Sequence, residues 1–178
     1  MIPVETPDDI LPRYRGTPIG KLLRYHELGE PLGEYTAAEL LVGMCMDHRK
    51  QLRLPRNYAY VLRAGGANLQ RVEFKVSFAV AVGGAKAICL IGHTQCGMVD
   101  LPSRREQFVE GLVARAGWSR AEAEAHFDRY APIFGIHDAA EFVAAEAARL
   151  RERYPLVPVG ALLYRVEDSR LYQLEAEA

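Results

Sequence analysis

Short apolar runs alternate along the chain with segments whose apolar residues recur at helical spacing. The apolar runs with the length of buried strands are residues 39–44, 58–63 and 87–91. The segments predicted to be helices are residues 72–82, 104–116, 119–130 and 138–154. Two further runs, 161–167 and 171–174, are separated by Asp168-Ser169 and predict a β-hairpin near the C-terminus.

Residues that start and stop helices support these boundaries. Ser119 and Asp138 each precede a helical segment, and both residue types cap helices by accepting hydrogen bonds from backbone N–H groups. Gly83 and Gly84 follow the first helical segment and predict its end. Pro155 follows the last segment, where a proline prevents the helix from continuing.

Strand followed by helix, repeated along the chain, predicts an α/β fold with a mostly parallel β-sheet flanked by helices on both faces. The first 35 residues differ, because they contain five of the ten prolines. We therefore expect residues 1–35 to form an N-terminal arm with short helical pieces and residues 36–178 to form the α/β domain. Such an arm can wrap a neighbouring subunit or lie on the surface of its own chain, and the sequence is equally consistent with both.

Composition adds little to this prediction, because the chain of 178 residues is 49% hydrophobic and carries a net charge of -1. That charge gives no reason to expect a nucleic acid or an acidic membrane as a partner. The longest apolar stretch, residues 78–91, is interrupted by Gly83, Gly84 and Lys86, and a bilayer-spanning helix needs roughly 20 apolar residues. The first residues lack the apolar core of an export signal, so the cytoplasm is the expected location.

The chain contains three cysteines, and an odd number in a protein without an export signal favours reduced thiols over disulfides. Cys89 lies within an apolar run and is expected to be part of the core. Cys45 and Cys96 follow predicted strands, and His93 forms a His-x-x-Cys pair with Cys96 in a glycine-flanked loop. Thiolate and imidazole are ligands that zinc favours.

The predicted strands end at Cys45, at the Arg63–Gly66 segment and at His93, and ligands of parallel sheets collect at the carboxyl ends of strands. Cys45, His93 and Cys96 therefore form a candidate zinc site. Three protein ligands leave a fourth tetrahedral position for water, which is the arrangement of catalytic zinc. The alternative interpretation is that these thiols are small buried hydrophobic groups.

The segment Cys45-Met46-Asp47-His48-Arg49 adds a carboxylate and a guanidinium beside the candidate site. Alternate residues of an extended segment share a face, so Cys45, Asp47 and Arg49 can point the same way. Arg49 would keep Asp47 ionised and oriented. Asp47 would then accept a hydrogen bond from a zinc-bound hydroxide or bind the zinc itself. A surface ion pair of no functional importance is the alternative.

Taken together, Cys-x-Asp-x-Arg from Cys45, the Arg63–Gly66 segment and Gly-His-Thr-x-Cys-Gly-Met from Gly92 resemble the motifs of the β-class carbonic anhydrases. The short chain and the form of the last motif are similar to the small, archaeal-type branch. The resemblance covers the chain from Leu40 to the C-terminus. It implies an α/β sheet with an added antiparallel edge strand, and a homodimer or a higher oligomer built from dimers, with N-terminal helices that embrace the partner.

The resemblance also implies the roles of individual residues. Cys45, His93 and Cys96 match the ligands of one zinc ion per chain, and Asp47 with Arg49 matches the catalytic dyad. A pair of glycines, Gly65 and Gly66, matches the turn beside the substrate cleft. If Arg49 turned away, Asp47 could displace the zinc-bound water and close the site, a change that the resemblance suggests can depend on pH.

The activity implied by the resemblance is the reversible hydration of carbon dioxide to bicarbonate by zinc-bound hydroxide. Three features depart from the family pattern: Ala64 replaces an asparagine, Gln95 replaces a frequent aspartate, and residues 102–136 form a long segment. Two alternatives therefore stay open. The same site could hydrolyse carbonyl sulfide or carbon disulfide, or the chain could be an inactive zinc-containing binding module.

Overall fold

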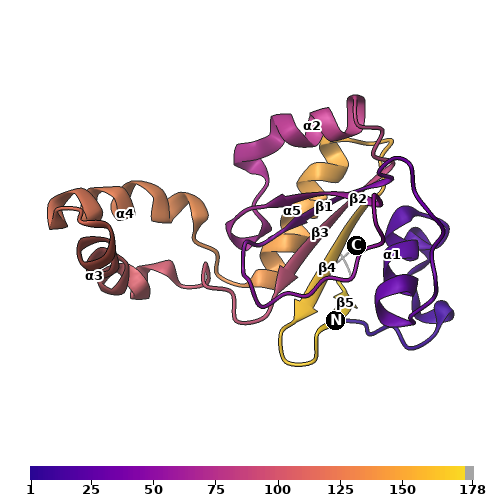
Figure 1. Ribbon diagram of the computed structural model, residues 1–178, viewed down its shortest axis with the longest axis horizontal. Helices are drawn as coiled ribbons and strands as arrows, with labels where there is room; N and C mark the ends of the chain where they lie inside the picture. Colours follow the sequence, from indigo (N-terminus) through magenta and orange to yellow (C-terminus); the bar gives the residue numbers. More distant parts are fainter. Residues whose placement is uncertain (175–178) are drawn as a thin grey trace.

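A five-stranded sheet forms the centre of the computed structural model, which describes residues 1–174 (Figure 1). The strands are β1 (Leu40–Met44), β2 (Ala59–Arg63), β3 (Ala87–His93), β4 (Val159–Arg165) and β5 (Arg170–Gln173). Their order in the sheet is β2-β1-β3-β4-β5, and β5 runs antiparallel to β4 while the other neighbours are parallel. The predicted fold class, a mostly parallel sheet with an antiparallel edge strand, is confirmed.

Within residues 1–174, five α-helices accompany the sheet: α1 (Pro18–Glu27), α2 (Glu73–Ala81), α3 (Arg105–Ala116), α4 (Arg120–Phe134) and α5 (Ala139–Arg153). The predicted caps are confirmed, because the side chains of Ser119 and Asp138 accept hydrogen bonds from the first turns of α4 and α5. The predicted end of α4 at Tyr130 is wrong, since the helix continues through Pro132. A proline in the last turn removes only one backbone hydrogen bond, so it does not stop the helix there.

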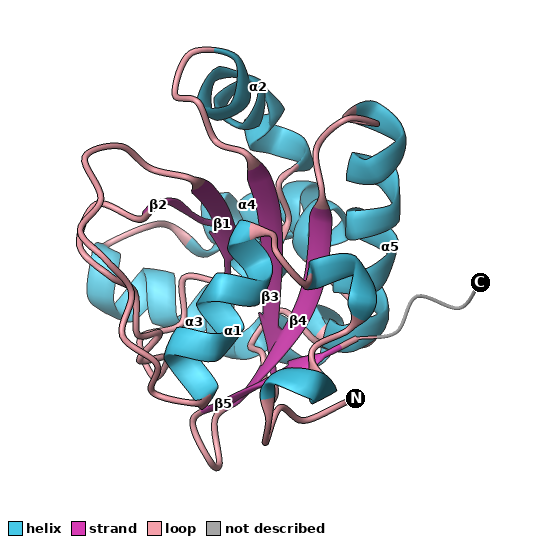
Figure 2. Ribbon diagram, turned by 90° about the vertical axis from the view of Figure 1, so that its right-hand side faces the viewer, coloured by secondary structure: helices cyan, strands magenta, loops and turns pink. Residues whose placement is uncertain are grey.

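Residues 1–35 cover one face of this sheet (Figure 2). Ile19, Leu22 and Leu23 of α1 are fully buried against apolar side chains of β1 and β3. The chain before α1 also joins the sheet edge, where the backbone N–H of Ile2 donates to the carbonyl of Gln173. The arm thus lies on its own chain, and its contact with a second subunit stays a prediction.

Helices α2 and α5 cover the opposite face. Val76 of α2 and Val143 and Ala147 of α5 are fully buried, and they belong to one apolar cluster with Ile88 and Leu90 of β3. Strand β3 is therefore enclosed on both faces, which explains why its sequence is an uninterrupted apolar run. Cys89 lies in this strand as an ordinary core residue, as predicted.

Helices α3 and α4 form a hairpin that projects from the carboxyl edge of the sheet, away from the rest of the chain (Figure 1). The two helices pack on each other, with the rings of Phe108 and Phe127 centred 5.2 Å apart. At its base, Asn68 donates a hydrogen bond to the carbonyl of Ile133. Residues 1–174 contain no helix long and apolar enough to cross a membrane.

Candidate metal centre

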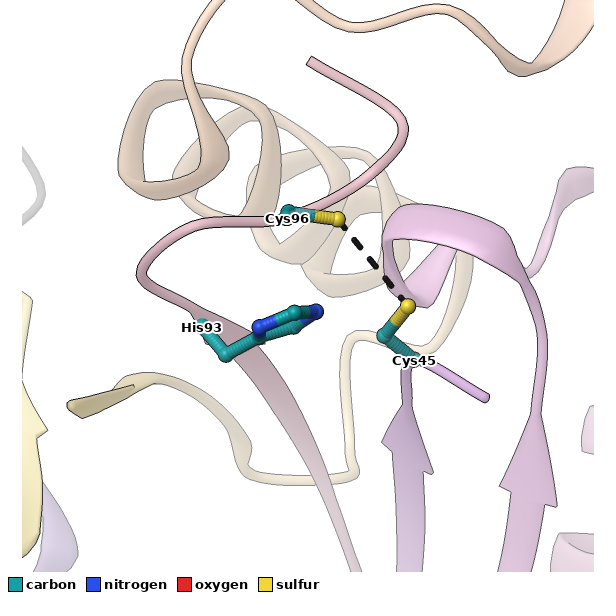
Figure 3. A group of neighbouring side chains, drawn as sticks. All are labelled: Cys45, His93 and Cys96. Carbon is teal, nitrogen blue, oxygen red and sulfur yellow. Dashed lines mark hydrogen bonds between the residues drawn. The ribbon is translucent and has the colours of Figure 1, made fainter. Parts of the chain in front are cut away.

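The structure brings Cys45, His93 and Cys96 together at the carboxyl edge of the sheet, as predicted. Cys45 directly follows β1, His93 is the last residue of β3, and Cys96 lies in the loop after it. The three side chains are buried and point toward one another (Figure 3), and their ligating atoms all lie within 4.8 Å of one another. Strands β1 and β3 are parallel neighbours, and Met44 pairs with Ile91, so the residues that follow meet at one place.

The loop after β3 turns back sharply so that Cys96 faces His93. Gln95 adopts a left-handed conformation with φ of 56°, which reverses the chain. The backbone N–H of Thr94 donates to the carbonyl of Tyr164, and its hydroxyl accepts from the backbone N–H of Val166. The hairpin of β4 and β5 therefore supports this loop.

The distances fit a tetrahedral zinc ion. The sulfurs of Cys45 and Cys96 are 3.9 Å apart, and both thiols are free. Two sulfurs bound to one tetrahedral zinc at about 2.3 Å would be about 3.8 Å apart. The same arrangement suits the residue types, because zinc prefers thiolate and imidazole ligands.

The histidine has a ring nitrogen that is free to bind a metal. His93 Nδ1 lies 2.8 Å from the carbonyl oxygen of Thr94, which can only accept, so Nδ1 carries the hydrogen. Nε2 then keeps its lone pair, and it is buried without a hydrogen-bond partner in residues 1–174. A backbone carbonyl that orients the ring in this way is common at metal sites.

Hydrogen bonds favour a thiolate at Cys45. The Cys96 thiol lowers the pKa of Cys45, and burial opposes that shift. Backbone N–H groups of Asp47 and Gly66 also lower it by donating to the sulfur. The pKa of Cys96 is raised, first because its thiol donates to Cys45 and then because of burial. A bound dication would favour the thiolate form of both sulfurs.

The two glycines at the end of β2 allow the chain to pass close to this centre. Gly66 has φ of 64°, a left-handed conformation that suits glycine. A Cβ on Gly65 would lie 2.8 Å from the sulfur of Met98. The glycine pair therefore lets the backbone approach Cys45 and Met98 closely, and its role in a substrate cleft stays a prediction.

Asp47 and Arg49 form a two-pronged ion pair beside the cysteines. Arg49 Nε donates to one oxygen of Asp47 at 3.0 Å, and Nη2 donates to the other at 2.8 Å. The backbone N–H of Arg49 donates to Asp47 as well. The guanidinium holds the pKa of the Asp47 carboxyl well below its usual range, and burial opposes this only in part. Both oxygens of the carboxylate thus accept from Arg49.

Sequence reasoning missed the part of Glu167 in this network. Arg49 donates to the side chain and to the carbonyl of Gln95, both at 2.9 Å. Gln95 Nε2 in turn donates to Glu167 at 2.9 Å, and the Thr94 hydroxyl donates to the same carboxylate at 2.7 Å. Glu167 lies far along the chain with no motif around it, so only the folded structure shows the contact.

Lys50 is the second residue that sequence reasoning missed. It directly follows the motif that carries Asp47 and Arg49, and it is buried. Its Nζ donates to the carbonyl of Cys45 at 2.7 Å. Burial lowers the pKa of the Lys50 ammonium to about 8, and the charge at Cys45 opposes this shift. A lysine is usually exposed, so nothing in the local sequence signals this position.

An apolar cavity of about 450 Å³ lies beside the candidate centre. Its lining includes Met46, Gly65, Met98, Phe108, Phe127 and Tyr130. Three of these residues are neighbours of the candidate ligands, and the aromatic ones come from the α3–α4 hairpin. His126, for which the sequence offers no motif, also lines the cavity. The long segment 102–136 thus forms one wall of this cavity, and Met98, which also lines it, packs against Cys45 and Cys96.

Comparison with solved structures identifies the fold. A carbonic anhydrase from Glaciozyma antarctica matches with a TM-score of 0.64 at 20% identity, covering 79% of this chain and 85% of that one. The β-carbonic anhydrase isoform I from Trichomonas vaginalis matches with a TM-score of 0.57 at 18% identity, covering 84% and 90%. The chain has the β-carbonic anhydrase fold.

A carbon disulfide hydrolase shares this fold too, with a TM-score of 0.56 at 19% identity, covering 86% of this chain and 85% of that one. No protein-family model matches the chain, and neither does any curated protein sequence. The similarity that the comparisons show is therefore one of backbone arrangement. The assignment to the archaeal-type branch stays a prediction.

Proposed function

We propose that this chain is a zinc-dependent enzyme that reversibly hydrates carbon dioxide to bicarbonate. Cys45, His93 and Cys96 would bind one zinc ion per chain. The observation that carries the proposal is the open three-ligand group, with sulfurs 3.9 Å apart and an unpartnered Nε2 on His93. A group of three protein ligands is typical of catalytic zinc, whereas structural zinc usually has four.

Zinc, when bound, supplies a Lewis acid that makes a water molecule acidic enough to react near neutral pH. Asp47, kept ionised by Arg49, would accept a hydrogen bond from that water. Arg49 itself is held by Gln95, so it cannot easily swing away from Asp47. These contacts favour keeping Asp47 paired with Arg49 over Asp47 becoming a ligand itself.

The apolar cavity supports a small neutral substrate. Carbon dioxide has no net charge or dipole, so apolar walls hold it without competing for a hydrogen bond. Met46, Gly65 and Met98 line the cavity on the side of the candidate ligands. Bicarbonate, in contrast, is charged and gains little from these walls, which favours its release into water.

A second candidate is hydrolysis of carbon disulfide or carbonyl sulfide at the same site. Two observations favour it: the fold is shared with a carbon disulfide hydrolase, and two methionine thioethers line the cavity. Sulfur is polarisable, so methionine side chains suit a sulfur-containing substrate. A homodimer, or a larger oligomer built from dimers, is proposed for either activity.

Stopped-flow measurement of carbon dioxide hydration, together with metal analysis of the same sample, tests the proposal. The assay should cover about pH 6.5 to about pH 9, which brackets the pKa range of zinc-bound water. We expect one zinc per chain and turnover that rises with pH. Zinc without hydration anywhere in this range would overturn carbon dioxide as the substrate.

Assays with carbonyl sulfide and carbon disulfide on that sample then separate the remaining possibilities. Turnover of either compound would support the second candidate. Bound zinc with no turnover of any of the three substrates would indicate a binding module. Light scattering gives the number of chains per particle independently of these assays.

A further inference from the structure

Lys50 is a buried cation without a carboxylate partner. The residue is 5% exposed, and its Nζ donates to the carbonyl oxygen of Cys45 at 2.7 Å. No carboxylate of residues 1–174 lies within ion-pairing distance of this ammonium. Lys21 and Lys86, in contrast, both form ion pairs with Glu39.

A buried ammonium group loses its hydration, and this loss is unfavourable unless negative charge faces it. The groups close enough to Lys50 to act on it electrostatically include Asp47, Cys45 and Cys96, and the two cysteines would become thiolates when a metal binds. Arg63 adds a second positive charge, because its Nη1 also donates to the Cys45 carbonyl at 3.4 Å. Two of the three groups that can offer Lys50 negative charge are thus candidate metal ligands.

The hydrogen bond of Lys50 also closes a short loop. Lys50 follows Cys45 by five residues and donates back to its carbonyl, so the segment between them is tied at both ends. This segment carries the ligand Cys45 and the Asp47–Arg49 pair. A shift in the position of the Cys45 carbonyl would therefore affect both the Cys45 sulfur and the Asp47 carboxylate.

We propose that Lys50 is a positioning residue of the metal centre, which fixes the Cys45 turn and whose positive charge stabilises the two thiolates that the metal requires. This inference rests on the proposed zinc site. If Lys50 served only the stability of the fold, its loss would weaken the metal-free protein and leave the zinc affinity of the folded protein unchanged. The two roles therefore predict opposite results.

The experiment compares Lys50→Met with the parent chain and with Lys86→Met as a matched control. Methionine keeps the length and the apolar stem of lysine but removes the charge and the donor. Lys86→Met removes the same charge at the surface, where it pairs with Glu39. Zinc affinity is measured by competition with a chromophoric chelator, and stability by urea unfolding of the metal-free proteins.

We expect Lys50→Met to bind zinc about 10- to 100-fold more weakly, the usual effect of losing a residue that supports a metal ligand. Its metal-free form should be as stable as the parent or more stable, since a buried charge has been removed. Lys86→Met should bind zinc like the parent. A zinc affinity of Lys50→Met within twofold of the parent would overturn the inference, and so would a loss confined to metal-free stability.

Lys50→Gln separates charge from hydrogen bonding and replaces the methionine variant if that protein does not fold. Its amide can still donate to Cys45 but carries no charge, so we expect a smaller loss of zinc affinity than with methionine. Full zinc affinity in Lys50→Gln would refute the electrostatic part of the proposal. A parent chain that binds zinc but does not hydrate carbon dioxide would contradict the proposed function and leave this comparison intact.

Discussion

Two histidines of this chain share the same burial and the same pattern of hydrogen bonds on the ring, but their neighbouring side chains differ. His26 and His93 are both buried, and each has an Nε2 without a hydrogen-bond partner in residues 1–174. In both, an oxygen atom lies 2.8 Å from Nδ1. Burial and an unpartnered ring nitrogen therefore do not identify a metal ligand.

The neighbours decide the difference. His93 faces the sulfurs of Cys45 and Cys96, so its Nε2 has two further ligands of the type that zinc prefers. His26 Nδ1 instead contacts the carboxylate of Glu27. This carboxylate also accepts from Arg170 at 2.9 Å and from the backbone N–H of Leu171 at 2.6 Å. The first arrangement suits a metal ion, and the second ties α1 to β5.

The largest effect should follow from removing a sulfur beside His93. We expect Cys96→Ser to lower zinc affinity by more than about 100-fold, since a lost ligand costs more than a lost supporting contact. His26→Gln, the matched change at the other histidine, should leave zinc affinity unchanged. Chelator competition measures both, and full zinc in Cys96→Ser would refute the ligand assignment.

Asp47→Asn sharpens the comparison on the side of His93. The amide keeps the shape of the carboxylate but loses its charge, so zinc should stay bound while hydration slows by about 100-fold. Stopped-flow turnover and metal content of one sample give both numbers. Unchanged turnover would remove Asp47 from the mechanism.

Glu27→Gln breaks the arrangement around His26. The amide removes the negative charge that faces His26 and Arg170, but Arg170 is partly exposed and keeps Glu5 as a partner, so we expect a loss of about 2 kcal/mol in the free energy of unfolding. Zinc affinity of the folded protein should not change. Urea unfolding at neutral pH measures the loss, and a difference below the error of the method would show that the pair contributes little.

The pH dependence of this loss follows from the pKa of Glu27. Burial raises that pKa, but His26, Leu171 and Arg170 outweigh it, so the pKa in the folded protein lies below its ordinary value. The stabilisation is therefore fully present above the unfolded pKa of about 4.3 and is lost as the pH falls through the lower folded value. The difference between parent and variant should shrink below about pH 4.

The smallest effect is expected for Glu167→Ala, which loosens the support of Gln95 and Arg49. Glu167 is exposed, and each lost hydrogen bond contributes little, so hydration should slow by about 2- to 10-fold with zinc retained. Asp168→Ala at the neighbouring position serves as the control. Equal effects of the two variants would show that the β4–β5 turn acts only as a scaffold.

Much of this architecture could be predicted from local sequence. The apolar run at 87–91 indicated a buried central strand, and Ser119 and Asp138 indicated helix starts, because periodicity and capping depend on near neighbours. The end of α4 could not be predicted in the same way. A proline can stand in the last turn of a helix or lie beyond its end, and packing decides which of the two applies to Pro132.

The sequence by itself determined the motif residues: His93 and Cys96 share one turn, and Asp47 and Arg49 are close enough to pair whatever the rest of the chain does. Only the tertiary structure decided that Cys45 lies next to His93 and Cys96, that Lys50 is buried against the carbonyl of Cys45, and that Glu167 accepts a hydrogen bond from Gln95. The physical reason is the range of the interactions. Backbone geometry sets contacts between near neighbours, whereas burial and remote contacts arise only when strands and helices pack.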